Sequence, residues 1–278
     1  MRTIITTVTA AVLISLLGSQ VGLATPKEDL DSFRAYFKSK FPDTPFDDYV
    51  NGVYSIDPAS REQWEAIEEF PPYEINVENG EQLFSKPFKN GKTYADCFKN
   101  GGENVRQDFP HFDKDSNQVV TLEMMINECR TDNGEEPLGL GKGEIADISA
   151  YMAYTSRGSE IDVEIPNKQA EEWYEKGKHF FYAKRGQLNM ACADCHVYYS
   201  GSYVRADLLS PALGQVTHFP VYRSKWGGLG TLHRRYEGCN KQVRAKPFKK
   251  QGEEYRALEY FHTYMSNGLE VNGPGARK

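Results

Sequence analysis

The sequence lacks any apolar run long enough to cross a membrane, and the longest run it has, Val8 to Leu17, falls well short. That run follows Arg2 and precedes the small residues at Gly22 to Ala24, which is the pattern of a cleavable signal peptide over residues 1–24. We therefore expect a mature chain that begins near Thr25 and is exported to the periplasm. An oxidising compartment of this kind permits chemistry on cysteine.

The sequence also lacks an excess of basic over acidic residues, and it shows little strand-like alternation. A net charge of −6 argues against a nucleic-acid partner. With 24 glycines and 14 prolines, helices joined by long irregular loops are expected, so the predicted fold class is mainly α. A length of 278 residues gives room for two modest domains.

Cysteine is scarce, and of five cysteines only two lie close together, in Cys192-Ala193-Asp194-Cys195-His196. Two thiols three positions apart can reach the two vinyl-derived carbons of one porphyrin, and the next residue can place its imidazole on the iron. The pentapeptide predicts one covalently bound haem c, attached through Cys192 and Cys195 with His196 as axial ligand.

Other sites that use such a pair fit less well. Zinc needs a second pair of ligands, and the remaining cysteines stand alone. A thioredoxin-like pair opens a helix after a strand, whereas Gly186 to Ala191 shows no strand pattern. A structural disulfide remains as the simpler alternative.

An internal repeat appears when the chain is shifted by 110 residues. The residues matched in type are Cys129/Cys239, Pro137/Pro247, Glu144/Glu254, Ile148/Leu258, Tyr151/Phe261, Tyr154/Tyr264, Ser156/Ser266 and Gly158/Gly268. Helical spacing predicts matched helices from Gly143 to Ser156 and from Glu253 to Ser266, each followed by a glycine. Each resembles the closing helix of a cytochrome c domain.

The repeat indicates two tandem cytochrome c-like domains. The first half reads Tyr94-Ala95-Asp96-Cys97-Phe98, the haem pattern without its first cysteine and its histidine. We expect a haem-less domain over residues 86–165 and a haem-binding domain over 166–278. Residues 25–85 form an N-terminal extension, with a helix predicted from the apolar spacing of Leu30 to Phe37.

The cysteines of the first half are the remains of a haem site. One of them would have held the porphyrin and the other would have stood on its distal side, so without haem Cys97 and Cys129 should lie close enough to bond. We predict a disulfide, with two buried free thiols as the alternative.

Cys239 is then unpaired. The repeat places it upstream of the closing helix, in the loop region that supplies the distal ligand of a cytochrome c, so we expect Cys239 to be the second axial ligand opposite His196. Met265 and Met190 are the competing ligands, and a buried structural cysteine is the simpler alternative.

Basic residues surround Cys239 in sequence: Arg223, Lys225, Arg234, Arg235, Lys241, Arg244, Lys246, Lys249 and Lys250. Such charge lowers the pKa of a thiol and attracts small anions.

Several of these motifs together resemble the SoxA family of cytochromes. They are the haem pentapeptide, Arg235 four positions before Cys239, the run from Cys239 to Phe248 and the ending from Tyr264 to Lys278. In the first half, Cys97 to Gly102 and Thr121 to Arg130 resemble the same family.

The resemblance implies a catalytic subunit of the thiosulfate-oxidising SoxAX complex, an L-cysteine S-thiosulfotransferase that forms a heterodimer with the SoxX cytochrome. Such enzymes join thiosulfate to a cysteine of the carrier protein SoxYZ. By this likeness Cys239 is the active-site cysteine, often found as a persulfide, and Arg235 binds the substrate. Many members carry two haems, and this chain departs from them at Tyr94 and Phe98.

Two other functions fit the same motifs. One is an electron-transfer cytochrome of the periplasm in which Cys239 is only structural. The other is a stand-alone thiosulfate dehydrogenase, which makes tetrathionate without a protein carrier.

Overall fold

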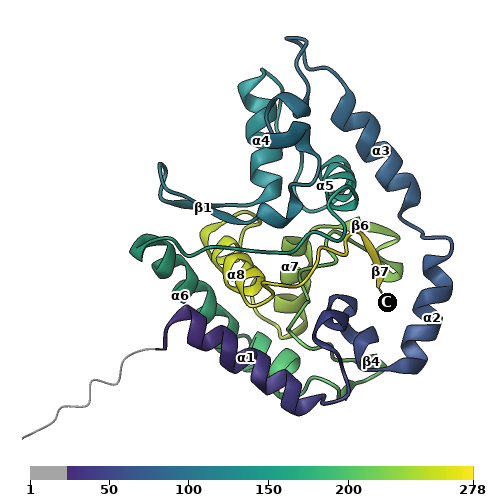
Figure 1. The fold of residues 1–278 in the computed structure, drawn as a ribbon, viewed down its shortest axis with the longest axis vertical. Coiled ribbons are helices and arrows are strands. Elements are labelled where there is room, and N and C mark those ends of the chain that lie inside the picture. Colours follow the sequence, from purple (N-terminus) through teal and green to yellow (C-terminus); the bar gives the residue numbers. More distant parts are fainter. Residues whose placement is uncertain (1–23, 278) are drawn as a thin grey trace, which may run out of the picture.

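The computed structural model describes residues 24–277, and most of its regular structure is helical (Figure 1). The predicted mainly-α class is confirmed. The predicted signal peptide lies outside the described residues except for Ala24. Among residues 24–277, no helix has the length and apolar character needed to span a membrane.

Helices and strands at matching positions form each half of the chain. The first half contains α3 (Glu74–Ser85), β1 (His111–Asp113), β2 (Gln118–Val120), α4 (Leu122–Asp132) and α5 (Glu144–Tyr154). The second half contains α6 (Lys168–Tyr182), β5 (Val221–Arg223), β6 (Gly228–Gly230), α7 (Leu232–Gln242) and α8 (Glu253–Tyr264). Both ends of β1, β2 and α4 lie 110 residues before those of β5, β6 and α7, the shift found in the sequence.

The first and last helices of each half cross at a glycine. A Cβ on Gly80 of α3 would lie 2.1 Å from the carbonyl oxygen of Asp147 in α5. A Cβ on Gly177 of α6 would lie 2.0 Å from the carbonyl oxygen of Ala257 in α8, at the corresponding position. Only glycine allows such close backbone approach, so both crossings have the same physical basis.

The two halves meet through equivalent segments. Gly158 donates its N–H to the carbonyl of Val271, and Gly268 donates to the carbonyl of Ile161, over 3.0 and 2.8 Å. Glu160 and Glu270, 110 residues apart, form an antiparallel bridge between these segments. Antiparallel pairing of equivalent residues means that a local two-fold axis relates these two segments.

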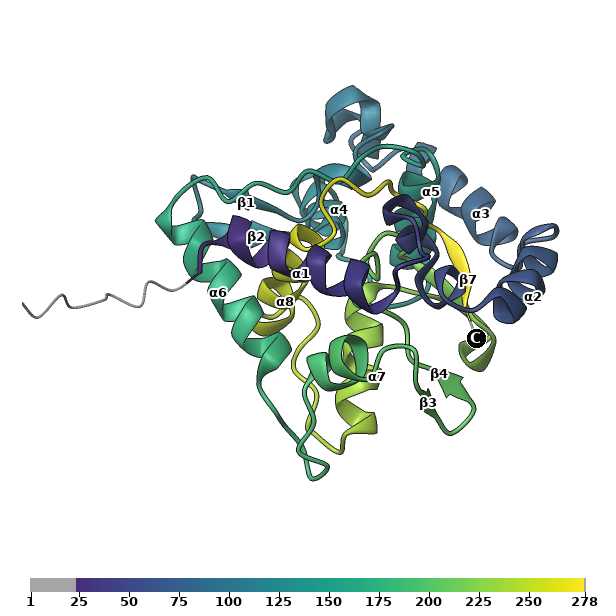
Figure 2. The same ribbon diagram turned by 60° about the horizontal axis from the view of Figure 1, so that its bottom comes forward.

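The N-terminal segment covers the second half and then runs past the first. α1 (Pro26–Lys40) buries Leu30, Phe33 and Phe37 in the core of the second half, and its Asp29 accepts a hydrogen bond from Tyr174 of α6. Figures 1 and 2 both show α1 beside α6. The predicted helix at Leu30 to Phe37 is thus present. α3 lies in the segment that the sequence assigned to the extension, yet it packs on α5 as α6 packs on α8.

Short elements complete the chain. They are η1 (Phe46–Ser55), α2 (Pro58–Glu68), η2 (Tyr94–Asp96), η3 (Lys99–Gly102), η4 (Arg106–Asp108), η5 (Asp194–Tyr198), β3 (Tyr203–Val204), β4 (Asp207–Leu208), η6 (Ser224–Trp226) and β7 (Gly275–Arg277). β3 and β4 form a small hairpin. β5 is the centre of a three-stranded sheet, antiparallel to β6 and parallel to the C-terminal strand β7.

Candidate haem and substrate site

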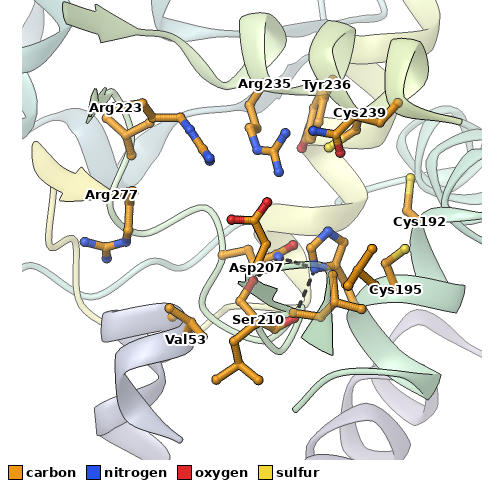
Figure 3. A pocket seen from close by; sticks show the side chains of 18 of the residues that line it. Val53, Cys192, Cys195, Asp207, Ser210, Arg223, Arg235, Tyr236, Cys239 and Arg277 are labelled. Carbon is orange, nitrogen blue, oxygen red and sulfur yellow. Dashed lines mark hydrogen bonds between the residues drawn. The ribbon is translucent and has the colours of Figure 1, made fainter. Parts of the chain in front are cut away.

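A cavity of about 500 Å³ lies in the second half (Figure 3). Its walls come from η1, α2, the segment between α6 and η5, η5 itself, the β3–β4 hairpin and the segment after it, β5, α7, α8 and β7. All five residues predicted to hold haem or substrate in this half line it: Cys192, Cys195, His196, Arg235 and Cys239.

The two cysteines predicted to attach haem lie at the start of η5, with Cys192 just before it and Cys195 within it. Arg185 and Met190 exchange two backbone hydrogen bonds of 3.1 Å and so close the turn that precedes Cys192. The Asp194 carboxylate then accepts the N–H of Ala191 over 2.8 Å, which caps the next helical turn. Cys192 and Cys195 are both free thiols that reach the cavity, as two thioether positions require.

His196 is prepared to bind a metal through Nε2. The carbonyl oxygen of Ser210 lies 3.0 Å from its Nδ1 and accepts a hydrogen bond in the tautomer protonated at that nitrogen, and the Gln215 side chain also lies against Nδ1. These contacts fix the ring orientation and leave Nε2 as the basic nitrogen. Burial lowers the pKa of His196 to about 4, so the imidazole is neutral at physiological pH, the form that binds iron.

Cys239 lies on α7 and not in a loop, so the predicted loop position is wrong. The buried positions Leu232, Tyr236 and Asn240 recur at helical spacing and hold α7 against the core. Cys239 is partly buried on the cavity side. Burial and then the nearby Cys239 sulfur raise the pKa of the Cys192 thiol to about 12, which places the two sulfurs in the same surroundings.

The two methionines considered as axial ligands differ in position. Met265 is buried in the core of the second half and is not among the residues that line the cavity. Met190 does line it, in the turn just before the attachment cysteines.

The donor set of the cavity fits a c-type haem. Two thiols, a neutral imidazole with a free Nε2 and a third thiol share one partly apolar space. Thiol, imidazole and thiolate are the groups that proteins use to attach haem and to ligate its iron.

The basic cluster is less concentrated at the site than the sequence suggested. Of its nine residues only Arg223 and Arg235 line the cavity. Lys241 and Lys250 both pair with Glu237, over 2.5 and 2.6 Å. Arg234 lies over the Trp226 ring, 4.2 Å from its centroid. Helical periodicity explains the difference, because neighbours in sequence on α7 face different sides.

Two further arginines, Arg185 and Arg277, line the cavity and were not singled out from the sequence. Arg277 belongs to the C-terminal run that resembles SoxA, but nothing local marked it as part of the site. Its place follows from the pairing of β7 with β5. Figure 3 shows Arg223, Arg235 and Arg277 along one side of the cavity.

The corresponding space in the first half contains aromatic side chains. Tyr94, in the place of the first attachment cysteine, is buried with its ring centroid 4.9 Å from that of Phe88. Phe98, in the place of the histidine, is buried as well. Cys97 and Cys129 form a disulfide with their Cα atoms 5.8 Å apart.

Comparison with known proteins first places the chain among cytochromes c. A family model described as the SoxA/TsdA cytochrome c domain matches residues 79–161, within the first half. A crystal structure of SoxXA from P. pantotrophus has a TM-score of 0.72 at 30% identity and covers 78% of this chain and 84% of that chain.

Relatives with known names define the family more closely. The L-cysteine S-thiosulfotransferase subunit SoxA of Chlorobaculum tepidum is 57% identical over 90% of this chain and 87% of its own length. The same subunit from Allochromatium vinosum is 56% identical over 93% of this chain and 92% of its own. The chain belongs to the SoxA family of L-cysteine S-thiosulfotransferase subunits. As a cytochrome of this family it carries covalently bound c-type haem.

Proposed function

We propose that the protein is the catalytic cytochrome subunit of a SoxAX complex and joins thiosulfate to a cysteine of a SoxYZ carrier. The observation that carries this proposal is the placement of Arg235 and Cys239 one helical turn apart on α7, both lining the cavity that contains Cys192, Cys195 and His196. A guanidinium one turn from a free thiol can hold a small dianion beside that sulfur. The names of the relatives support the same chemistry.

In the proposed site Cys192 and Cys195 would hold the haem by thioether bonds, and His196 and Cys239 would ligate its iron. When bound, the haem would supply a one-electron acceptor close to Cys239, with SoxX as the partner that receives the electrons. The SoxXA neighbour supports a SoxX partner. Ser210 and Gln215 keep the imidazole oriented through Nδ1.

The sulfur chemistry takes place on this chain's own cysteine. Arg235 binds thiosulfate, and the sulfur carried by Cys239 forms a bond to the terminal sulfur of thiosulfate with loss of two electrons. The carrier thiolate then attacks the sulfur atom bonded to the sulfonate group and takes over the thiosulfonate group. The bond from that sulfur to the sulfur on Cys239 breaks, and the Cys239 sulfur leaves as its anion, ready for another cycle. The overall change is carrier thiol plus thiosulfate to carrier S-thiosulfonate, one proton and two electrons.

The substitution Cys239→Ala tests the role of this cysteine. We expect loss of thiosulfate transfer to SoxYZ, measured as the mass increase of the carrier, together with retention of the covalent haem, measured on the intact chain. Lys241→Gln, two positions along α7 and exposed, is the matched control that keeps transfer. Transfer by Cys239→Ala at the normal rate would contradict the catalytic role.

Two measurements separate the alternatives. Low-temperature EPR distinguishes a histidine/thiolate haem from the histidine/methionine haem of an electron-carrier cytochrome. Assays with and without SoxYZ distinguish the proposed transferase from a stand-alone thiosulfate dehydrogenase, which forms tetrathionate without a carrier.

We also propose export to the periplasm by the signal peptide at residues 1–24. The intact mass of the chain purified from the periplasm should correspond to a start near Thr25, one haem, one disulfide and any extra sulfur on Cys239. A mass that includes residues 1–24 would contradict cleavage.

A further inference from the structure

Arg223 and Arg277 reach the same end of the cavity because of strand pairing. Arg223 ends β5 and Arg277 ends β7, and the two residues are direct partners in the parallel ladder. Paired residues on neighbouring strands project from the same face of a sheet. Both arginines line the cavity.

Within the described residues neither guanidinium forms an ion pair. Arg277 donates Nη1 to its neighbour's carbonyl, but its Nε and Nη2 are buried without a hydrogen-bond partner. Burial lowers the pKa of each group to about 10, and Arg235 adds to the effect on Arg223. Two partly buried cations therefore lie at this end of the site without a direct acidic partner, an arrangement that is unfavourable unless anions bind there.

The nearby acidic side chains do not neutralise the pair. Glu68 is the acidic side chain whose charge acts on the pKa of Arg277. Its carboxylate oxygens already accept hydrogen bonds from Trp64, Tyr73 and the backbone of β7. Asp207 of the β3–β4 hairpin acts on Arg223 only at long range. His218, beside Arg277, is buried and its pKa lies well below the usual range, so it adds no charge.

Aromatic rings hold Arg277 in place. Its guanidinium lies 5.1 Å from the ring centroid of Tyr54 and 5.4 Å from that of Trp64. These rings position the group without supplying negative charge. The arginine is thus fixed in orientation before any anion arrives.

The position of the pair along the cavity identifies the anion. Figure 3 shows Cys192 and Cys195 at one end and Arg223 and Arg277 at the other. In the porphyrin of haem c, the two carbons that form thioethers and the two propionate carboxylates lie on opposite edges of the ring. A haem attached at the cysteines therefore directs its propionates toward the arginine pair.

We propose that Arg223 and Arg277 bind the two haem propionates, leaving Arg235 to bind the substrate. The C-terminal strand β7 then belongs to the haem site. The haem propionates and the thiosulfate substrate bind to different arginines of the same cavity. This inference rests on the proposed attachment through Cys192, Cys195 and His196, and not on the thiosulfate reaction.

The test is redox titration of the haem in the purified SoxAX complex carrying Arg223→Gln or Arg277→Gln. Loss of a cation beside the haem favours the ferric state, so the midpoint potential should fall. A propionate without its guanidinium has a raised pKa, so the potential should also acquire a pH-dependent step near neutrality that the parent protein lacks. Arg277→Lys keeps the charge and should retain most of the potential.

Arg234→Gln is the matched control, because Arg234 lies against Trp226 and is not among the residues that line the cavity. Its potential should equal that of the parent.

If a glutamine variant does not fold, the propionate bending band in resonance Raman spectra of the parent decides the matter, since propionates held by arginine should not titrate between pH 6 and 8. Titration in that range, or glutamine variants that keep the potential and raise only the KM for thiosulfate, would overturn the proposal. The propionate assignment is judged from the potential and the Raman band alone, so it does not depend on whether Cys239→Ala loses thiosulfate transfer.

Discussion

At the residue scale, the candidate chemistry depends on which side of α7 each side chain faces. Arg234 and Arg235 are adjacent in sequence, but Arg234 contacts Trp226 whereas Arg235 lines the cavity with Cys239. Charge density along the sequence therefore overstated the number of cations at the site. What matters is the few guanidinium groups that face the cavity.

Substitution of Arg235 should weaken the use of thiosulfate. A charge-assisted hydrogen bond contributes about 1.5–3 kcal/mol, so Arg235→Gln should lower kcat/KM for thiosulfate by roughly tenfold or more. Steady-state assays with SoxYZ measure the effect, and Arg234→Gln should remain close to the parent. An unchanged kcat/KM would remove Arg235 from the substrate site.

The buried His262 should make stability depend on pH. Burial lowers its pKa to about 3 in the folded chain, from an ordinary value of 6.5. Between these values the unfolded chain binds one more proton than the folded chain, so the stability falls as the pH is lowered, by about 1.4 kcal/mol per pH unit.

His262→Gln removes this contribution and should reduce the slope of stability against pH between pH 6.5 and 4, while His196 and His218, whose pKa values are also lowered by burial, keep theirs. Urea unfolding of the parent and the variant at several pH values measures the difference. Parallel pH profiles for the two proteins would show that the folded His262 binds its proton normally.

At the element scale, the two helix crossings are set by glycine. α3 crosses α5 at Gly80, and α6 crosses α8 at Gly177, with the opposing carbonyl about as close in each case. The sequence predicted α5 and α8 from their apolar spacing, but the matching glycines lie 97 residues apart and not 110, so the repeat did not reveal them.

An alanine at either crossing should push the helices apart. Gly177→Ala and Gly80→Ala should each lower the free energy of unfolding by about 3 kcal/mol, the upper range for overpacked cores. Gly139→Ala, where a new Cβ meets no atom within 4 Å, is the control. Chemical denaturation measures all three, and equal stabilities would show that the crossings are not tight.

Across the molecule as a whole, the two halves differ in what occupies their equivalent regions. The second half encloses the cavity, and the first fills the equivalent region with aromatic rings and the Cys97–Cys129 disulfide. The disulfide closes a loop over a sequence separation of 32 residues.

Removal of that disulfide should lower stability without affecting the haem. The loop length corresponds to about 4 kcal/mol on the chain-entropy model. Cys97→Ser/Cys129→Ser should lose stability of that order in urea unfolding and keep its haem content, which the pyridine haemochrome spectrum measures. Loss of haem together with stability would show that the halves depend on each other.

Residue patterns alone were enough to predict the mainly helical class, a c-type haem and the family. The pentapeptide from Cys192 to His196 is a local pattern, in which spacing within one turn already determines which side chains lie together, and the repeat is visible because residue types recur at one constant shift. The prediction of a loop around Cys239 was wrong. The helix there has only a few buried residues, so its polar sequence shows no clear apolar periodicity.

The tertiary structure alone decided which cations reach the cavity. Arg277 meets Arg223 only because β7 pairs with β5, more than 50 residues earlier in the chain. Pairing between strands so far apart depends on the whole core and leaves no local pattern to read. Local spacing therefore predicted the atoms that attach haem, and long-range packing decided the charges around them.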